Sequence, residues 1–296
     1  MNYIIKNYCY TFEKGYQKNE TLRKSLDRLS QATFGGLSFE RFYHLGFWTD
    51  NIIPYTLFRE GNAVSNLFVS IMDVRHNGKA KRYVQLGAVM TDKAYRNRGL
   101  SRFLIEMAID EWQNKSDAIF LFANDSVTDF YPKFGFVKEH EYDYSISVTA
   151  QTCKMRKLDM ENPSDLDFLL QKVKGGNPFA SFTVGSCEYA MFHCTMFYTD
   201  CVFYSEDFDA IAVCKEENGF LTCYDIFCDA KNNLRHILSA VATAQKQNVI
   251  LGFTPVDTQG FDVAVSEEED TTLFVLNNKE NIFNAERIKF PMLSRT

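Results

Sequence analysis

The sequence lacks the features that would assign it to a membrane, to nucleic acid or to an oxidising compartment. No window approaches 18 uninterrupted apolar residues, so we expect neither a membrane-spanning helix nor a membrane partner. No long run of Lys or Arg is present and the net charge is −6, which argues against nonspecific binding of nucleic acid. There is no secretory signal and no Cys-x-x-Cys pair among the eight cysteines. We therefore expect buried free thiols in a cytoplasmic protein rather than disulfides.

Metal chemistry also has little support. The five histidines are scattered along the chain, and only His193 and Cys194 stand together. We interpret this stretch as a strand, in which neighbouring side chains face opposite sides and cannot share a metal. No metal ligand is therefore predicted.

The composition is that of a globular protein large enough for two domains. Of the 296 residues, 46% are hydrophobic and 24% are charged, and each half is long enough to bury its own core. The 27 phenylalanines suggest apolar clefts as well as cores. A small partner is more plausible than a macromolecular polyanion.

The stretch from Val89 to Phe136 carries the most specific pattern. An apolar strand runs into the polar turn Arg96–Ser101, from which an amphipathic helix departs. Free N–H groups at a helix start attract anions, and Gly99 lets a phosphate approach the backbone closely. A buried strand then ends at Asn124, and a short helix carrying Tyr131 follows. The stretch predicts a phosphate site beside a second polar lip.

The remaining elements of the first half follow from periodicity and turn residues. A second short helix is predicted after Gly35-Gly36, and its rings either pack on the sheet or line an acceptor pocket: Phe39, Phe42, Tyr43, Phe47 and Trp48. The wider aromatic segment from Phe34 to Trp48 is expected to influence substrate choice. The other predicted elements are a strand within 1–13, a helix at 20–32, a hairpin of 52–58 with 64–74, a strand at 83–91, a helix after Gly99 and a strand at 118–123.

From about residue 151 the same order of elements begins again. The predicted elements are a strand at 153–158, a helix from Pro163, a hairpin of 211–215 with 220–228 around Glu217-Asn218-Gly219, a helix at 232–247 and strands at 249–253 and 272–276. This order indicates an internal duplication. The second copy has no Arg-x-x-Gly turn, and we interpret the acidic run Glu267–Asp270 as a solvated loop.

Together, the strand, the Arg-x-x-Gly turn, the amphipathic helix, the strand ending in Asn124 and the sequence Phe130 to Phe136 resemble the GNAT superfamily of acyl-CoA N-acyltransferases. The resemblance covers roughly residues 1 to 148. It implies an α/β (α+β) fold of two GNAT-like domains, each a mixed, central, mostly antiparallel sheet flanked by helices. Residues 1–148 would form the domain with the acetyl-CoA site. Residues 149–296 would form a degenerate GNAT-like domain without a CoA motif.

The resemblance also implies roles for individual residues. Tyr131 resembles the family's general acid, which protonates the departing thiolate of CoA. Asn124 would hydrogen-bond the pantetheine arm. The residues assigned to acetyl-CoA along the strand edge and the phosphate turn are Val89, Met90, Thr91, Arg96, Asn97, Arg98, Gly99, Leu100 and Ser101.

The general base is not evident from the resemblance. Gln85 occupies the strand position where some family members have a glutamate, and an amide cannot take a proton at neutral pH. Asp50, Glu60 and Glu40 are alternatives by placement, as are a water chain or an amine that arrives neutral.

The implied function is transfer of an acetyl group from acetyl-CoA to a primary amine of a small molecule or peptide by direct attack. The alternative is a non-catalytic acyl-CoA-binding module for regulation or interaction, favoured by Gln85 and by the degenerate second half. The acceptor and the oligomeric state are not indicated by the sequence.

Overall fold

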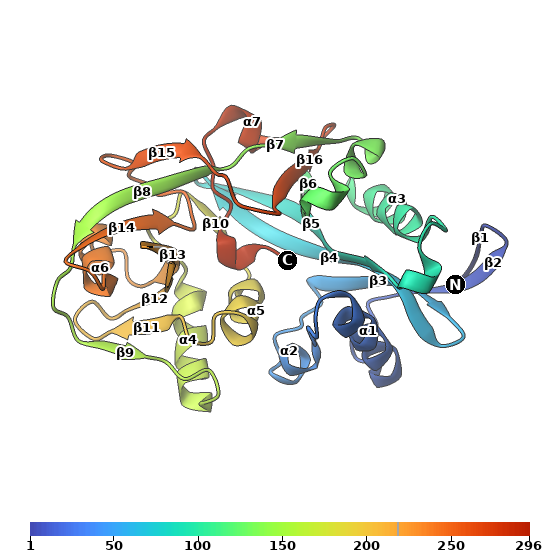
Figure 1. Cartoon of the computed structure of the whole chain (residues 1–296), viewed down its shortest axis with the longest axis horizontal. Coiled ribbons are helices and arrows are strands. Elements are labelled where there is room, and N and C mark those ends of the chain that lie inside the picture. The colour runs from blue at the N-terminus through green and yellow to red at the C-terminus, as the bar shows by residue number, and fades with distance from the viewer. Residues whose placement is uncertain (218) are drawn as a thin grey trace.

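Two β-sheets standing side by side organise the molecule (Figure 1). The structure is a computed structural model, and it describes residues 1–217 and 219–296. In the first sheet the strand order is β1-β2-β3-β4-β5-β6-β16-β7, and β10 also pairs with β4. Its strands are β1 (Asn2–Ile5), β2 (Tyr8–Lys14), β3 (Ile52–Arg59), β4 (Asn62–His76), β5 (Lys79–Thr91), β6 (Ala118–Ala123), β7 (Phe136–Glu139), β10 (Phe182–Val184) and β16 (Thr272–Leu276).

The second sheet has the order β15-β8-β14-β13-β12-β11-β9. Its strands are β8 (Tyr142–Thr149), β9 (Met155–Lys157), β11 (Val202–Ser205), β12 (Ala210–Glu217), β13 (Phe220–Phe227), β14 (Lys246–Leu251) and β15 (Asp262–Val265). Within each sheet one described pair is parallel, β5 with β6 and β13 with β14, and the other described pairs are antiparallel. Both sheets are therefore mixed and mostly antiparallel, as the resemblance implies.

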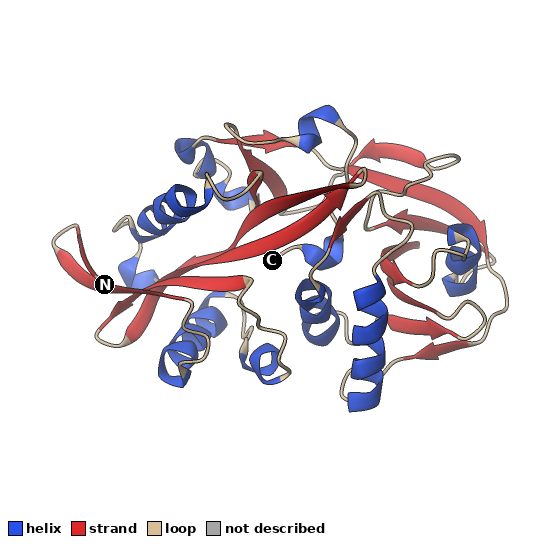
Figure 2. Ribbon diagram, turned by 180° about the vertical axis from the view of Figure 1, so that it is seen from behind, coloured by secondary structure: helices blue, strands red, loops and turns tan. Residues whose placement is uncertain are grey.

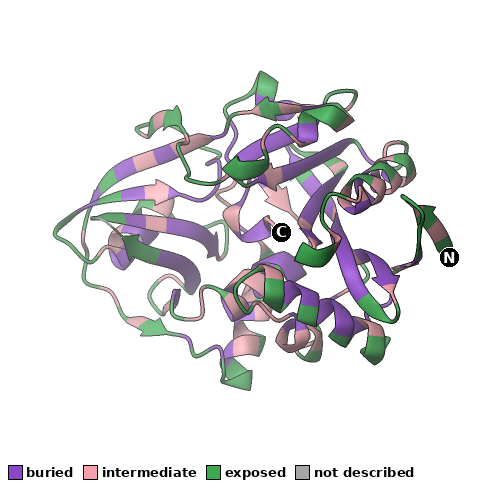
Figure 3. Cartoon of the chain, turned by 45° about the vertical axis from the view of Figure 1, so that its right-hand side comes forward, coloured by how far each residue is buried: buried purple, intermediate pink, exposed green. Residues whose placement is uncertain are grey.

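Helices cover both faces of each sheet. On the first sheet, α1 (Glu20–Thr33) and α2 (Glu40–His44) pack over one face and α3 (Leu100–Trp112) over the other. Leu26 and Leu104 of these helices are fully buried. The second sheet has α4 (Pro163–Gly175) and α5 (Cys187–Met196) on one face and α6 (Leu234–Val241) on the other. Figure 3 shows the resulting buried residues along the central strands and the exposed residues on outer loops.

Shorter helical segments complete the fold. Helix α7 (Ile282–Ala285) packs on the same core as α1. The described residues include 3₁₀ turns at Lys93–Tyr95, Asp125–Val127, Tyr131–Phe134 and Met292–Ser294. In the described part of the chain, no helix combines the length and the apolar character needed to cross a membrane.

The same strand–helix–strand unit occurs in both halves. Strand β5 is followed by α3 and the parallel β6, and strand β13 is followed by α6 and the parallel β14. Each unit is preceded by an antiparallel hairpin, β3–β4 in one half and β11–β12 in the other. This recurrence agrees with the predicted duplication.

Each sheet contains a strand from the other part of the chain. Strand β16 lies between β6 and β7 in the first sheet, whereas β8 lies between β14 and β15 in the second. The predicted division between residues 148 and 149 therefore does not follow the two sheets. Periodicity identifies Thr272–Leu276 as a strand but cannot show which sheet it joins, because each residue in it is buried and no exposed face marks its partner.

Several predicted elements differ from the structure for identifiable reasons. The predicted first strand is a hairpin, because Lys6 and Asn7 adopt left-handed backbone conformations with φ of 47° and 67°. The predicted helix at 232–247 ends at Val241, and Lys246 already belongs to β14. In the predicted turn at Glu217-Asn218-Gly219, Asn218 lies outside the described residues.

The strand interpretation of His193 and Cys194 is wrong, because both residues belong to α5. This helix packs between the two halves of the molecule and is apolar around much of its circumference. It therefore lacks the one-sided pattern that reveals a surface helix. All eight cysteines are free thiols, and four of them, Cys194, Cys201, Cys214 and Cys223, are buried.

Candidate active site

The first sheet opens where β5 and β6 diverge. Their parallel pairing ends at Gln85 and Phe120, and both strands continue beyond that point, to Thr91 and Ala123, without pairing to each other. A cavity of about 930 Å³ lies at this opening, and both strands line it. Figures 1 and 2 show the C-terminus of the chain at the same place, against the long central strands.

A β-bulge in β5 marks the same position. Asn66 of β4 faces Met90, but Phe68 faces Gly87, so that one residue of β4 opposes two of β5. Within the bulge, Ala88 has a φ of 43°, a left-handed conformation that is costly for a residue with a Cβ. Bulges of this kind turn main-chain groups out of the hydrogen-bonded ladder. Residues 87–89 line the cavity as a result.

The polar turn before α3 has the geometry of an anion cradle. Asn97 and Gly99 both have left-handed backbones, with φ of 63° and 82°. Gly99 is the N-cap of α3, and no side chain caps the free N–H groups of the first turn. Arg96 and Ser101 line the cavity, and the Ser101 hydroxyl is 2.8 Å from that of Thr91. The positive end of the α3 dipole is therefore open beside one cationic side chain.

Arg98 has a different place from the one predicted. Its guanidinium donates to the carbonyl of Ala94 at 2.9 Å and lies over the rings of Tyr8 and Tyr95, at 4.7 and 4.8 Å from their centroids. It does not line the cavity. Arg98 therefore braces the turn, and only Arg96 of the two arginines is directed to the cavity.

Asn124 forms the opposite lip of the cavity and is fixed by the C-terminal part of the chain. Its amide nitrogen donates to the Asp270 carboxylate at 2.7 Å, and the same carboxylate accepts the main-chain N–H of Asp125 at 2.8 Å. The side-chain oxygen of Asn124 is left as a hydrogen-bond acceptor. Asp270 is an exposed turn residue, as the solvated-loop interpretation predicts, but its carboxylate also fixes Asn124 and Asp125.

Tyr131 opens onto the same cavity from the first residue of its 3₁₀ turn. Its ring is buried against Phe136 and Phe274, and its hydroxyl has no hydrogen-bond partner among the described residues. Burial raises the pKa of Tyr131 to about 12. The phenol is consequently protonated at neutral pH and can donate a proton.

The structure brings only some of the predicted site residues together. Five line the cavity: Val89, Arg96, Ser101, Asn124 and Tyr131. Six others lie in the same strand and turn but outside the lining: Met90, Thr91, Asn97, Arg98, Gly99 and Leu100. Met90 and Leu100 are buried in the core beneath it. The opening of the sheet thus gathers both predicted lips around one space.

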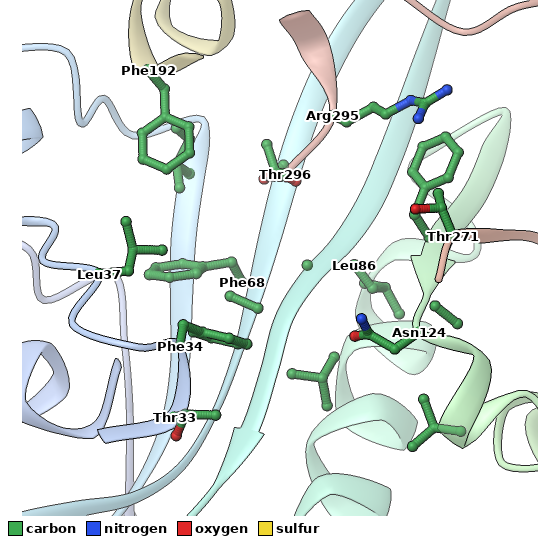
Figure 4. Close-up of a pocket in the computed structure, with 18 of the residues that line it drawn as sticks. Thr33, Phe34, Leu37, Phe68, Leu86, Asn124, Phe192, Thr271, Arg295 and Thr296 are labelled. Atoms are coloured by element: carbon green, nitrogen blue, oxygen red, sulfur yellow. Dashed lines mark hydrogen bonds between the residues drawn. The ribbon is translucent and has the colours of Figure 1, made fainter. Parts of the chain in front are cut away.

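The second half of the chain supplies a wall of the cavity that sequence reasoning missed. Phe192, His193 and Phe197 come from α5 and the residue after its end, and Arg295 and Thr296 come from the C-terminal segment. Figure 4 shows Phe192 and Thr296 facing the space between Phe68 and Asn124. No motif marks these residues, because their role depends on how the two sheets pack.

His193 anchors the C-terminal segment to α5. Its Nε2 is 2.7 Å from the main-chain carbonyl oxygen of Arg295, so Nε2 carries the proton and Nδ1 has a lone pair without a partner. Burial lowers the pKa of His193 to about 4. The imidazole is therefore neutral at physiological pH.

Gln85 binds the last residue of the chain. Its amide nitrogen donates to the main-chain oxygen of Thr296 at 2.6 Å, and the Thr296 hydroxyl is 3.1 Å from that of Ser70. The approach is close enough that a Cβ on Gly87 would lie 2.6 Å from the same oxygen. An oxygen acceptor is thereby held directly beside the bulge in β5.

The three carboxylates considered as bases lie outside the cavity lining. Asp50 accepts from Gln17, Glu40 is paired with Arg23, and Glu60 is exposed in the β3–β4 turn. Of the described lining residues only Glu268 has a carboxylate side chain, and Arg295 and Lys289 lie 2.6 and 3.7 Å from it. Burial raises the pKa of Glu268, but these cations outweigh burial and hold it below its ordinary value. Glu268 is therefore a paired anion rather than a base.

Comparison with known protein families gives a match to the first part of the chain. Residues 5–138 match the family model described as an acetyltransferase (GNAT) domain. The comparison with curated proteins gave no match.

Solved structures match the chain over both sheets. A probable N-acyltransferase of Enterococcus faecalis V583 is 14% identical, with a TM-score of 0.56 over 90% of this chain and 73% of that one. Eis1 from Mycobacterium abscessus is 12% identical, with a TM-score of 0.52 over 89% and 73%. A GCN5-related N-acetyltransferase from Kribbella flavida is 12% identical, with a TM-score of 0.51 over 91% and 72%. At these identities the likeness of the solved structures concerns the fold, and residues 5–138 are the part of the chain that matches the GNAT acetyltransferase family.

Proposed function

We propose that the protein is an N-acetyltransferase that moves an acetyl group from acetyl-CoA to a primary amine of a small molecule or peptide. The observation that carries the proposal is that the Tyr131 phenol opens into the same cavity as Val89, Arg96 and Asn124, at the point where β5 and β6 diverge. Binding and cleavage of a CoA thioester require three features: a cradle for the pyrophosphate, two edges that hold the extended pantetheine arm, and a proton donor for the thiolate.

The cradle before α3 holds the pyrophosphate of acetyl-CoA. The N–H groups of the first turn of α3 and the Arg96 guanidinium supply the positive charge. The pantetheine arm lies along Val89, Met90 and Thr91, and its amide N–H groups donate to the side-chain oxygen of Asn124. Asp270 fixes the orientation of Asn124 by accepting its amide N–H.

Transfer proceeds by direct attack of the amine nitrogen on the thioester carbonyl. Attack forms the C–N bond and a tetrahedral intermediate, the C–S bond then breaks, and Tyr131 gives its proton to the departing thiolate. The proton that the attacking nitrogen loses passes to water, and water returns a proton to Tyr131. Holding the two reactants together contributes most of the rate, roughly 7–11 kcal/mol, whereas a positioned acid contributes about 100- to 10,000-fold.

The amine reaches the thioester as the free base. Gln85 cannot accept a proton and Glu268 is held by two cations, so no free side-chain carboxylate lines the described cavity. The main-chain oxygen of Thr296, held by Gln85, accepts an N–H of the amine. This hydrogen bond directs the lone pair of the amine nitrogen toward the carbonyl carbon of the thioester.

The second domain, residues 149–296, binds no CoA in this proposal and closes the acceptor side of the cavity through α5. We place the protein in the cytoplasm, where its eight free cysteines remain reduced.

Replacement of Tyr131 by Phe tests the role of the phenol. We expect Tyr131→Phe to lower kcat by about 100-fold or more, within the range for general acids, and to leave the affinity for acetyl-CoA unchanged. CoA release measures turnover with a panel of amines, and calorimetry measures acetyl-CoA binding. Tyr83→Phe is the matched control, because it removes a buried hydroxyl without a partner from outside the cavity.

An unchanged kcat in Tyr131→Phe would remove Tyr131 from the mechanism. Binding of acetyl-CoA without turnover across amines, polyamines, aminoglycosides and peptides would instead favour the acyl-CoA-binding module.

A further inference from the structure

The acceptor side of the cavity is built from aromatic rings of both halves of the chain. We define the aromatic wall as the six lining residues Phe34, Phe39, Trp48, Phe68, Phe192 and Phe197. Five of the six, all except Phe34, are joined by ring contacts, with ring centroids 5.1 Å apart for Phe39 and Phe68 and 5.4 Å apart for Phe192 and Phe197. Phe39 also stacks on Phe192 at 5.9 Å, so the wall is continuous across the two halves.

The wall faces the proposed cofactor lips. In Figure 4, Phe34 and Phe68 lie on one side of the cavity, Asn124 lies on the other, and Thr296 lies between them. Thr296, whose oxygen is the proposed contact of the amine, lines the same cavity as the wall and the proposed cofactor lips.

The mouth of the cavity leaves apolar surface uncovered. Phe34 is 39% exposed and Phe197 is 52% exposed, and both line the cavity. Exposed rings that line one cavity mark a binding surface more often than isolated exposed side chains do. The wall thus continues from the interior to the entrance, as required for an acceptor with an apolar body.

Among the described lining residues, no unpaired anionic side chain is available to bind a second ammonium group of the acceptor. The ionisable side chains among the described lining residues are Arg96, Tyr131, Tyr189, His193, Glu268 and Arg295. Arg295 is bound by Glu141 and Glu268, both at 2.6 Å, and the Tyr189 hydroxyl donates to a main-chain oxygen. A ring face can hold one ammonium ion, but further charges of a polyamine or basic peptide would be buried without a partner.

We propose that the acceptor is a monoamine with an apolar body of about the size of an aromatic ring, an arylalkylamine, which lies on the aromatic wall with its amine directed to Thr296. This inference rests on the proposed acetyl transfer. The inference restricts the acceptor to amines that carry an apolar ring. Binding of that ring to the aromatic wall releases water from both surfaces, which favours the complex.

The test compares amines of similar basicity on the wild-type protein. Initial rates of CoA release are measured with acetyl-CoA and phenethylamine, tryptamine, ethanolamine, putrescine or an aminoglycoside. We expect kcat/KM for phenethylamine to exceed that for ethanolamine and putrescine by at least 10-fold. Equal or higher values for ethanolamine, putrescine or the aminoglycoside would overturn the inference while leaving acetyl transfer in place. No CoA release with any amine would instead overturn the proposed function.

Variants of Phe34 and Phe197 test whether the preference for phenethylamine over ethanolamine depends on the aromatic wall. Phe34→Ser and Phe197→Ser should reduce the ratio of kcat/KM for phenethylamine over ethanolamine at least 5-fold, with the KM for acetyl-CoA unchanged. Phe220→Ser is the matched control, because Phe220 is 45% exposed and lies outside the cavity. A ratio that does not change in either wall variant would overturn the placement of the ring on the wall.

A longer acyl chain is the other apolar group that the wall could bind. Hexanoyl-CoA and benzoyl-CoA are therefore compared with acetyl-CoA at a fixed concentration of ethanolamine. Faster transfer of these acyl groups, lost in Phe34→Ser and Phe197→Ser, would assign the wall to the acyl donor and overturn the inference.

Discussion

At the scale of single residues, Gly87 is in close contact with the C-terminal residue Thr296. Gly87 is not in a left-handed conformation, so its backbone would accept alanine, but the added Cβ would lie 2.6 Å from the main-chain oxygen of Thr296. A main-chain atom cannot turn aside as a long side chain can. The absent side chain at Gly87 is therefore what allows the last residue to reach β5.

We expect Gly87→Ala to lower the free energy of unfolding by about 1–3 kcal/mol, as overpacking in a core does. Urea unfolding measures the change. Gly175→Ala is the control, because a Cβ there meets nothing within 4 Å. Equal stability of the Gly87 variant and the wild type would mean that the C-terminal segment moves without cost.

His193 makes stability depend on pH in a definite direction. Its pKa is about 4 in the folded protein, because burial penalises the charged ring, against an ordinary value of 6.5. As the pH falls, His193 therefore binds its proton at a higher pH in the unfolded chain than in the folded protein. The stabilisation is fully present above pH 6.5 and is lost as the pH falls from 6.5 toward 4.

Replacement of His193 by Gln isolates this effect, because the Gln amide nitrogen can donate to the Arg295 carbonyl as Nε2 does. Between pH 7 and 4.5 the wild type should lose on the order of 2 kcal/mol more than His193→Gln. Urea unfolding across this range measures the difference, and parallel curves for the two proteins would contradict the low pKa.

At the scale of elements, an ionic cluster centred on the largely buried Arg295 fastens the C-terminal segment to both sheets. Arg295 lies over the ring of Phe122 of β6 and donates to Glu141, just before β8, and to Glu268, before β16. Glu141 also accepts the main-chain N–H of Phe290 at 2.8 Å. The cluster therefore joins the points at which the chain crosses from one sheet to the other.

We expect Arg295→Gln to destabilise the protein by about 3–5 kcal/mol, because Glu141 would remain buried without its cation. Arg82→Gln, which breaks the exposed pair with Asp73, should cost less than about 1 kcal/mol. Both values come from urea unfolding. Similar costs for the two variants would mean that water or a rearranged side chain satisfies Glu141.

Elements with local signals were predictable from the sequence. The strand Ala118–Ala123, the start of α3 after Gly99 and the hairpin of β3 and β4 have the predicted positions, because run length, a glycine cap and turn residues fix them locally. Helix α5 was missed because it is buried on several sides. The predicted cavity lips are likewise local features, whereas Phe192, Phe197 and Thr296 line the cavity through packing between distant segments, which no local pattern records.

At the scale of the whole molecule, the crossing of β8 and β16 makes the two sheets interdependent. Residues 1–148 alone would lack β16, which pairs with both β6 and β7, and would leave β8 without β14. The remaining edges would expose unpaired main-chain groups and apolar side chains. Neither half therefore has a complete core.

We expect residues 1–148 expressed alone to be insoluble or to unfold without a cooperative urea transition, whereas the full chain unfolds in one transition. Co-expression with residues 149–296 should restore soluble protein, since the two pieces together hold the residues of every described strand and only the last residue of β8 is separated. Circular dichroism and soluble yield are the measurements. A cooperative transition in residues 1–148 alone would show that the first sheet closes without β16.

The exchange of β8 and β16 between the sheets also delays completion of the first sheet during translation. Strand β7 ends at Glu139 and β16 begins at Thr272, so translation at about 5–20 residues per second leaves the first sheet incomplete for on the order of ten seconds. During that interval the facing edges of β6 and β7 are free to pair with other nascent chains. The fraction of chains that reach the native state is then governed by ribosome speed and chaperone supply as well as by final stability.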